Sequence, residues 1–136
     1  MGLLPSTAKT SGRLVLGSQG ETQAINFLRK NGLRILARNY RFGRKEIDII
    51  ARDKGTICFI EVKTRSSNEF GLPQEAVTAK KIEHLTMLAL NYIKRYALFD
   101  CDFRFDVVSV LWVKPEKEPV IDYIKDAFVV DERWSV

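Results

Sequence analysis

The sequence predicts one α/β domain in which two helices pack on a β-sheet. Three observations support this fold class. Apolar residues recur at helical spacing in two segments, near residues 14–30 and 75–96. Between and after them lie short β-branched and aromatic segments that are typical of strands. The length of 136 residues suits a single core. The predicted order of elements is therefore α-β-β-β-α-β, over a domain that spans residues 13–136.

The first helix is expected over roughly residues 14–30. It follows a polar, aperiodic stretch at residues 1–12, which we expect to be a flexible terminus. Asn31-Gly32 is typical of the left-handed residue pair that ends a helix. The stripe expected to face the core comprises Leu14, Gly17, Glu21, Ala24, Ile25 and Leu28. Glu21 is therefore an acid on the face of the helix that packs on the sheet.

Residues 33–40 predict a strand with imperfect alternation, and segments 46–52 and 56–64 predict a hairpin that turns at Lys54-Gly55. A two-residue turn pairs Asp53 with Thr56. A three-residue loop with a glycine bulge would give a different register.

In the two-residue register, Asp48 lies opposite Glu61, and Glu46 lies opposite Lys63. Both faces of this hairpin carry apolar residues, so we expect it at the centre of the sheet. One face is expected to hold Ile47, Ile49, Ala51, Ile60 and Val62, and the other Ile50 and Phe59.

The remainder of the chain completes the sheet. Residues 66–73 have the composition of a loop, and a second helix is expected over about 75–96. Residues 103–113 predict a strong strand. A turn at 115–119 follows, and then segments 120–124 and 127–130 are expected as short strands or extended chain.

Composition and charge narrow the class of protein. The hydrophobic share of 46% and the charged share of 29% are ordinary for a soluble domain. There is no membrane-spanning apolar run or secretory opening, and two cysteines without a metal-binding spacing suit a reducing cytoplasm. The net charge of +5 is uneven, because residues 1–52 carry +7 and residues 97–136 carry −4. A basic first half favours a polyanionic partner such as nucleic acid, although a solvated basic surface would look the same.

The acids of the hairpin are the strongest functional signal. Two carboxylates opposite each other on neighbouring strands stand roughly 5 Å apart. At an effective dielectric near 20, their repulsion is about 3 kcal/mol. That is large against a total stability of about 5–15 kcal/mol. A divalent cation bound by Asp48 and Glu61 would offset this repulsion, with Lys63 beside it.

Four residues together suit one chemistry. Glu21, Asp48, Glu61 and Lys63 have a summed charge of −2, which one divalent ion would balance. Mg²⁺ prefers oxygen ligands, and such an ion activates water and neutralises charge on a phosphoryl group. Lys63 could orient the water or stabilise the transition state. The chain has one histidine and no phosphate-binding glycine loop. The residues therefore favour a hydrolytic phosphodiesterase.

An ordered set of motifs resembles the YraN-like family of small bacterial proteins. That family is usually placed in the PD-(D/E)XK, or restriction-endonuclease-like, superfamily. The motifs are Gly20-Glu21-x-x-Ala24, Ile35 to Arg41, Glu46 to Ala51, and Phe59 to Arg65, with further likeness at Phe70-Gly71, Ala76-Val77, Lys80-Lys81 and Arg104 to Val107.

The resemblance implies a mixed central sheet flanked by helices, with the active site on two central strands. It implies that Asp48 and Glu61 are metal ligands, that Lys63 is the catalytic lysine, and that Glu21 is a helix-borne acid of the same site. The implied cofactor is Mg²⁺ or Mn²⁺.

Candidate nucleic-acid contacts are the cations Arg38, Arg41, Arg44, Arg65, Lys80 and Lys81. Each of them could instead be a solvated charge, and Arg38 could instead pair with Glu21. Tyr40, Phe42 and Phe70 could stack on bases or simply pack within the fold. Asp106 is expected to be structural.

The preferred hypothesis is a metal-dependent endonuclease that cleaves DNA, including branched forms. The sequence does not distinguish DNA from RNA, and cutting two strands would favour a homodimer. The first alternative is a non-catalytic nucleic-acid-binding module that retains the nuclease fold. The second is a scaffold whose acids bind a structural ion or none.

Overall fold

The computed structural model describes residues 12–66 and 78–128, and the side chains of the first helix from Ser18 onward. All of the expected tail at residues 1–12 except Gly12, which begins the first helix, and most of the expected loop at 66–73 lie outside the described residues. The elements are α1 (Gly12–Lys30), β1 (Arg34–Phe42), β2 (Lys45–Asp53), β3 (Thr56–Ser66), α2 (Ala79–Arg95), β4 (Asp102–Trp112) and β5 (Val120–Ile124).

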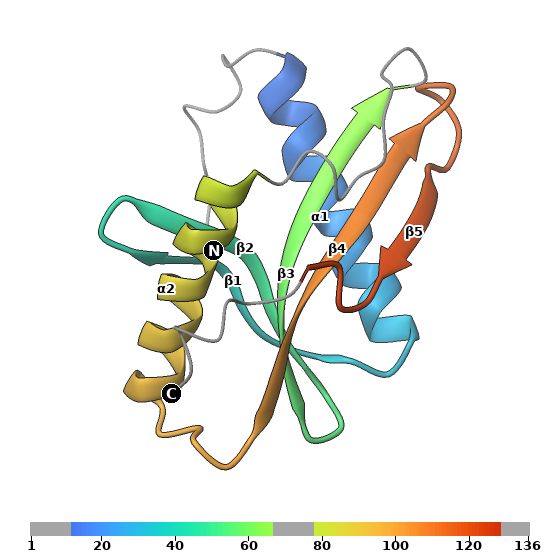
Figure 1. Ribbon diagram of the computed structural model, residues 1–136. Helices are drawn as coiled ribbons and strands as arrows, with labels where there is room; N and C mark the ends of the chain where they lie inside the picture. The colour runs from blue at the N-terminus through green and yellow to red at the C-terminus, as the bar shows by residue number, and fades with distance from the viewer. Residues whose placement is uncertain (1–11, 67–77, 129–136) are drawn as a thin grey trace, which may run out of the picture.

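The five strands form one mixed sheet in the order β1-β2-β3-β4-β5. Strands β3 and β4 are parallel and are joined through α2, whereas the other neighbouring pairs are antiparallel. The predicted fold class, an α/β domain with a mixed sheet flanked by helices, is confirmed. The hairpin β2–β3 lies inside the sheet as expected, and the outer strands are β1 and β5 (Figure 1).

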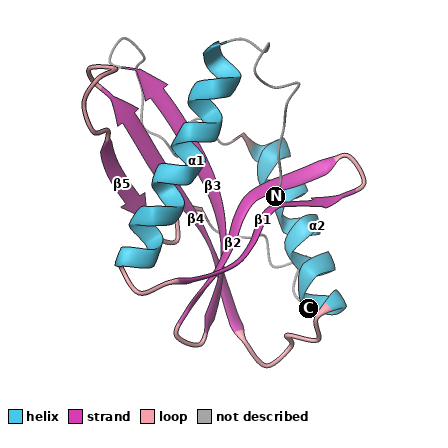
Figure 2. Ribbon diagram, turned by 180° about the vertical axis from the view of Figure 1, so that it is seen from behind, coloured by secondary structure: helices cyan, strands magenta, loops and turns pink. Residues whose placement is uncertain are grey.

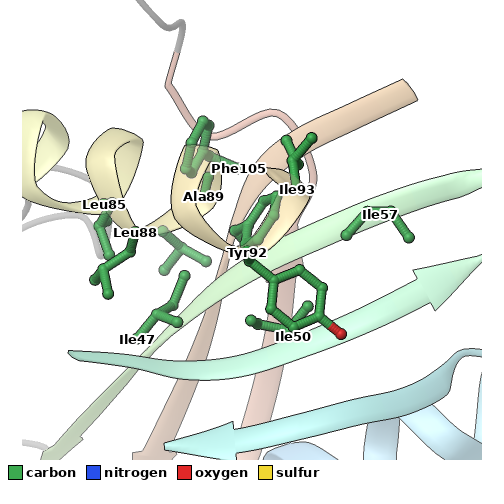
Figure 3. Close-up of a cluster of buried hydrophobic side chains, with 11 residues drawn as sticks. Ile47, Ile50, Ile57, Leu85, Leu88, Ala89, Tyr92, Ile93 and Phe105 are labelled. Atoms are coloured by element: carbon green, nitrogen blue, oxygen red, sulfur yellow. The ribbon is translucent and has the colours of Figure 1, made fainter. Parts of the chain in front are cut away.

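The two helices cover opposite faces of the sheet, and each covers its own hydrophobic core (Figures 1 and 2). On the α2 side, Tyr92, Ile93 and Leu85 pack against Phe105 and the strands beneath, as Figure 3 shows. The core on the α1 side comprises Ala24, Ile25, Leu28, Leu33, Ile49, Ala51, Cys58, Ile60, Val108 and Val110. Because both faces are covered, the central strands are held from both sides.

The predicted two-residue turn and its register are confirmed in β2–β3. Asp53 pairs with Thr56, and the ladder continues to Ile49 opposite Ile60. Lys54, in the turn, adopts a left-handed φ of 57°.

The ladder between β2 and β3 ends at that point, and two expectations about the residues beyond it are wrong. Glu46 does not pair with Lys63; it lies opposite Arg41 on β1, and its carboxylate accepts from Arg41 at 2.7 Å. Ile47 joins the core on the α2 side, whereas Ile49 joins the core on the α1 side. Strand β2 therefore leaves β3 and changes the face that it presents at the position between these two isoleucines.

Strand β1 contains a bulge that accounts for its imperfect alternation. Ile35 pairs with Ala51 and Ala37 pairs with Ile50, so one residue of β1 has no opposite partner. The strand follows the helix stop that Asn31-Gly32 predicted, where Gly32 has a φ of 87°.

Helix α2 begins later than expected. Thr78 has extended backbone angles, and its side-chain oxygen accepts a hydrogen bond from the backbone N–H of Lys81, so it is the N-cap of the helix. The expected start at residue 75 is therefore wrong, and residues 75–77 lie outside the described residues. After β5, a turn leads to Ala127, whose N–H donates to the carbonyl of Phe105 at 2.8 Å. Residues 127–128 are not part of a strand, and the rest of the expected segment 127–130 lies outside the described residues.

Helix α1 approaches β3 closely because residue 20 has no side chain. A Cβ atom added at Gly20 would overlap the hydroxyl of Thr64. Glycine inside a helix costs up to about 1 kcal/mol relative to alanine. Here the close approach offsets that cost, and it brings the next residue, Glu21, against the central strands.

We expect Gly20→Ala to lower the free energy of unfolding by about 1–3 kcal/mol, because the added methyl group has no room and the helix must shift. Denaturant titration measures this effect. Gly55→Ala is the matched control, since a Cβ at Gly55 meets nothing within 4 Å. Equal stability of the Gly20 and Gly55 variants would show that the helix does not depend on this contact.

Candidate active site

The candidate site lies where β2 separates from β3. Past the pair Ile49–Ile60, β2 stays paired with β1 alone. At this fork, the side chain of Asp48 replaces a backbone hydrogen bond of the ladder. Its carboxylate accepts a hydrogen bond from the backbone N–H of Val62 at 2.8 Å. A carboxylate thus satisfies a backbone donor that would otherwise have lost its partner in the ladder.

The side chains of Asp48 and Glu61 interact at the fork, although the ladder ends at Ile49–Ile60 and the two residues are not strand partners as the register predicted. Their side chains are hydrogen-bonded to each other. Glu61 is only 5% exposed, and Asp48 is half-buried. Because two carboxylates this close repel each other, the folded protein favours the protonated form of Glu61.

The surroundings raise the pKa of both carboxyl groups. Burial, and then the charge of Asp48, raises the pKa of Glu61 to about 7. Burial also raises the pKa of Asp48, although the hydrogen bond from Val62 opposes this. Because the two groups titrate together, the raised pKa belongs to the pair. The site therefore disfavours a second negative charge unless a cation is near.

Two lysines supply part of that positive charge. Lys81, in the first turn of α2, places its Nζ 3.3 Å from Glu61 Oε2. Lys63, two residues beyond Glu61 on β3, also acts on Glu61 and lowers its pKa. Lys81 was expected to contact nucleic acid, and the structure places it in the acid cluster itself.

The sequence contains a signal for this role of Lys81. Lys80 and Lys81 lie in the first turn of α2, which has no acidic residue. Cations are unfavourable at that end of a helix, where the macrodipole is positive. A lysine at this position therefore indicates that its charge interacts with a group outside the helix, as Lys81 does with Glu61.

Glu21 reaches the same fork from the opposite face of the sheet. Burial raises its pKa, and the charge of Asp48 contributes to the same shift, so the two groups lie close enough to interact. Its carboxylate is bound by Arg38 of β1, with Nε 3.4 Å from Oε1. Arg38 also donates to the hydroxyl of Thr22 and to the carbonyl of Ser18. The pairing of Glu21 with Arg38 that the sequence left open is present.

The fork explains how side chains from both helices interact with one acid. Helices α1 and α2 lie on opposite faces of the sheet (Figure 1). Where neighbouring strands are paired, the sheet separates the side chains of the two helices. Where β2 turns away, the sheet is open, and Asp48 interacts with Glu21 of α1 and with Lys81 of α2.

A family model described as "Uncharacterised protein family UPF0102" matches residues 20–110. The chain belongs to this family. The resemblance to the YraN-like proteins is thereby confirmed, and the matched segment contains Glu21, Asp48, Glu61 and Lys63.

Relatives and a solved structure agree in length with this chain. A UPF0102 protein of Chlorobium phaeobacteroides is 46% identical over 118 residues, which cover 84% of this chain and 93% of that protein. A UPF0102 protein of Caldicellulosiruptor saccharolyticus is 45% identical over 113 residues, with coverage of 83% and 96%. The solved structure of Hjc, a Holliday junction resolvase from Archaeoglobus fulgidus, is similar with a TM-score of 0.46 and 18% identity, and covers 86% of this chain and 89% of that chain.

The donor set of this UPF0102 site fits a small divalent cation in part. Asp48 and Glu61 offer carboxylate oxygens, and Mg²⁺ needs only one or two carboxylates beside its waters. Within residues 12–66 and 78–128, no three acidic, histidine or cysteine side chains are placed to hold a metal ion together. Glu21 is bound to Arg38, so its expected role as a third ligand stays a prediction.

The other expected cationic contacts lie in different settings. Arg41 is exposed and bound to Glu46, and Lys80 is exposed at the start of α2. Arg65 is half-buried near the end of β3. None of these positions tests the predicted contact with nucleic acid, which stays a prediction.

Asp106 has a structural role, as expected. It is fully buried, and its carboxylate accepts from Arg104, Tyr123 and the backbone N–H of Asp126. The same Arg104 binds Asp53 at 2.9 Å, which ties β4 and β5 to the turn between β2 and β3. The carboxylate of Asp106 is therefore used in hydrogen bonds within the fold.

No helix among the described residues is long and apolar enough to cross a membrane.

The raised pKa of Glu61 predicts how stability depends on pH in the metal-free protein. The folded state binds the proton of Glu61 more tightly than the unfolded chain does, so unfolding releases it. The stabilising contribution is present below the ordinary value of 4.5 and is lost as the pH rises through about 7. The loss amounts to at most about 3 kcal/mol.

Urea titrations of wild type and Glu61→Gln from pH 5 to pH 9, in chelator, measure this loss. The free energy of unfolding of the wild type should fall relative to that of the variant as the pH rises to about 7. Above that pH, the difference between the two should stay constant. Glu83→Gln, an exposed change on α2, is the control and should follow the wild type. Parallel curves for wild type and Glu61→Gln over the whole range would contradict the raised pKa of Glu61.

Proposed function

We propose that this UPF0102 protein is a metal-dependent nuclease that hydrolyses phosphodiester bonds in DNA. The observation that carries the proposal is the buried pair Asp48–Glu61, which is held at the open edge of the fork with Lys63 and Lys81 beside it. Two buried carboxylates this close to each other repel, whereas a cation site needs them in this arrangement.

In the proposed reaction, a water oxygen bonds to the phosphorus, the bond to the leaving sugar oxygen breaks, and that oxygen takes up a proton. The chemistry that a divalent cation supplies when bound is the activation of water and the neutralisation of charge on the phosphoryl group. Asp48 and Glu61 would hold the cation, and the N–H of Val62 fixes the Asp48 carboxylate for this purpose. Mg²⁺ and Mn²⁺ are the cations that such oxygen ligands suit.

The lysines have separate roles in this proposal. Lys63 lies two residues beyond Glu61 on the same strand, and its ammonium group would stabilise negative charge that develops on the phosphoryl oxygens. Lys81 is a positioning residue, because its contact with Glu61 favours the ionised carboxylate. Arg38 holds Glu21 at the edge of the site.

A second candidate is a nucleic-acid-binding module without catalysis. The ion pairs of the acids favour this candidate, because Glu21 is bound to Arg38 and Glu61 to Lys81 and both carboxylates already have a cationic partner. In that case the cationic surface would bind DNA or RNA with strong salt dependence, and no phosphodiester bond would be broken. A homodimer, which would place two sites on the two strands of a duplex, also stays a prediction.

The test is a cleavage panel of single-stranded, duplex, flap and four-way DNA, with RNA alongside, in Mn²⁺, in Mg²⁺ and in chelator. We expect metal-dependent cleavage of at least one DNA form. Glu61→Gln and Lys63→Ala should each reduce the rate by a factor of about 100 or more, because each removes a charge that acts on the reacting phosphate.

Matched controls are Glu83→Gln and Lys94→Ala, which change the same residue types at exposed positions on α2 and should cleave as wild type does. Circular dichroism confirms that each variant is folded. Equal cleavage by the wild type and both site variants would indicate a contaminating nuclease and would remove the claim. Salt-sensitive binding without any cleavage would favour the binding module.

A further inference from the structure

The hairpin β1–β2 extends beyond the rest of the sheet. Its ladder continues to Phe42 opposite Lys45, whereas the ladder between β2 and β3 has already ended at Ile49. Figures 1 and 2 both show this hairpin projecting by itself from the body of the protein. We call residues 41–45 the hairpin tip.

The hairpin tip combines an exposed aromatic ring with positive charge. Phe42 is 46% exposed, and Arg41 and Arg44 are exposed beside it. Arg41 is neutralised by Glu46 at 2.7 Å. In the described part of the chain, Arg44 and Lys45 have no ion pair, so their charges are available to an anionic partner.

The structure holds this tip in place. The Tyr40 hydroxyl donates to the side-chain carbonyl of Asn91 on α2, and the ring of Tyr40 packs edge-on against Tyr92 with centroids 5.1 Å apart. The turn uses Gly43 with a φ of 63°, which glycine adopts without strain. The tip is therefore presented at a defined distance from the sheet.

An exposed aromatic ring beside two cations without an ion pair, Arg44 and Lys45, suits a nucleic acid better than it suits an acidic protein surface. The cations complement phosphates, and the ring can stack on a base or enter between base steps. A two-stranded β-ribbon also fits the major groove of DNA. An acidic protein would use the charges and would leave Phe42 without a partner of its own.

Strand geometry sets the distance between the tip and the acid pair. Lys45 and Asp48 are three residues apart on β2, which corresponds to about 10 Å. Nucleotides follow one another at about 3.4 Å along the axis of a DNA helix, so this length spans about three nucleotides.

We propose that the hairpin tip binds the DNA strand about three nucleotides from the bond that is cut, with Arg44 and Lys45 on phosphates and Phe42 stacked on a base. The position relative to the cut rests on the proposed nuclease function, whereas the contact itself does not. The tip thereby fixes the strand, and the acid pair acts on a phosphate at a set distance from it.

DNA affinity in chelator tests the contact without any cleavage. Fluorescence anisotropy with a labelled duplex and its single strand, at several salt concentrations, gives affinity and salt dependence. We expect Phe42→Ala to weaken binding about 5- to 150-fold, since one base–aromatic stack is lost. Arg44→Ala and Lys45→Ala should each reduce the slope of log affinity against log salt by about one.

Controls of the same residue types lie away from the tip. Phe99→Ala removes a phenylalanine that is 57% exposed in the connection between α2 and β4. Lys117→Ala removes an exposed lysine between β4 and β5, at the opposite edge of the sheet from β1. Both should bind DNA as wild type does, and Phe42→Trp should retain affinity because it keeps a ring.

The contacted base is located with 2-aminopurine placed at successive positions of the DNA. Its fluorescence change on binding should be largest at one position and should be lost in Phe42→Ala. Where the wild type cleaves in metal, that position should lie about three nucleotides from the cut.

The outcomes separate this inference from the proposed function. Loss of affinity in the tip variants without metal-dependent cleavage by the wild type would support the tip and remove the nuclease. Wild-type affinity in the tip variants, or no DNA affinity in the wild type, would overturn the tip. A changed oligomeric state of DNA-free Phe42→Ala at unchanged DNA affinity would also overturn it, because the tip would then contact a second copy of the chain.

Discussion

The hydrogen bond from the backbone N–H of Val62 to the carboxylate of Asp48 holds the site together. It forms where the ladder between β2 and β3 stops, and it satisfies a partly buried donor that the departing strand leaves behind. The same bond fixes an acid next to Glu61, on the neighbouring strand. The acids therefore come together at the place where the two strands separate. Beyond this place, β2 pairs with β1 alone, and these two strands end in the hairpin tip.

The two cores make this arrangement stable enough to persist. Asp48 and Glu61 repel each other, and in a loosely packed sheet this repulsion would separate them. Buried isoleucines and aromatic rings fix β2 and β3 from both faces. Lys81 and Arg38 then add opposite charge from α2 and from β1. The repulsion is thus retained at one place, while the rest of the sheet supplies the stability that tolerates it.

Particular residues show how far sequence reasoning reached. The turn at Lys54-Gly55 set the register from Asp53–Thr56 to Ile49–Ile60, because pairing in a hairpin is local and follows from loop length. Asp48 and Glu61 lie just past the end of that ladder. The same logic failed for Glu46 and Lys63, since it assumed that the ladder continues. The side chain of Asp48 ends that ladder, and alternation alone carries no information about where neighbouring strands separate.

The sequence by itself determined the α/β class, the order of the elements as far as β4 and the family, since these follow from local periodicity and ordered motifs. Only the tertiary structure decided that Lys81 contacts Glu61, that Arg38 binds Glu21, and that both faces of the sheet supply residues to one fork. Those contacts join segments far apart in the chain. Their formation depends on how closely Gly20 lets α1 pack on β3 and on where β2 leaves the sheet, and these are properties of packing in three dimensions.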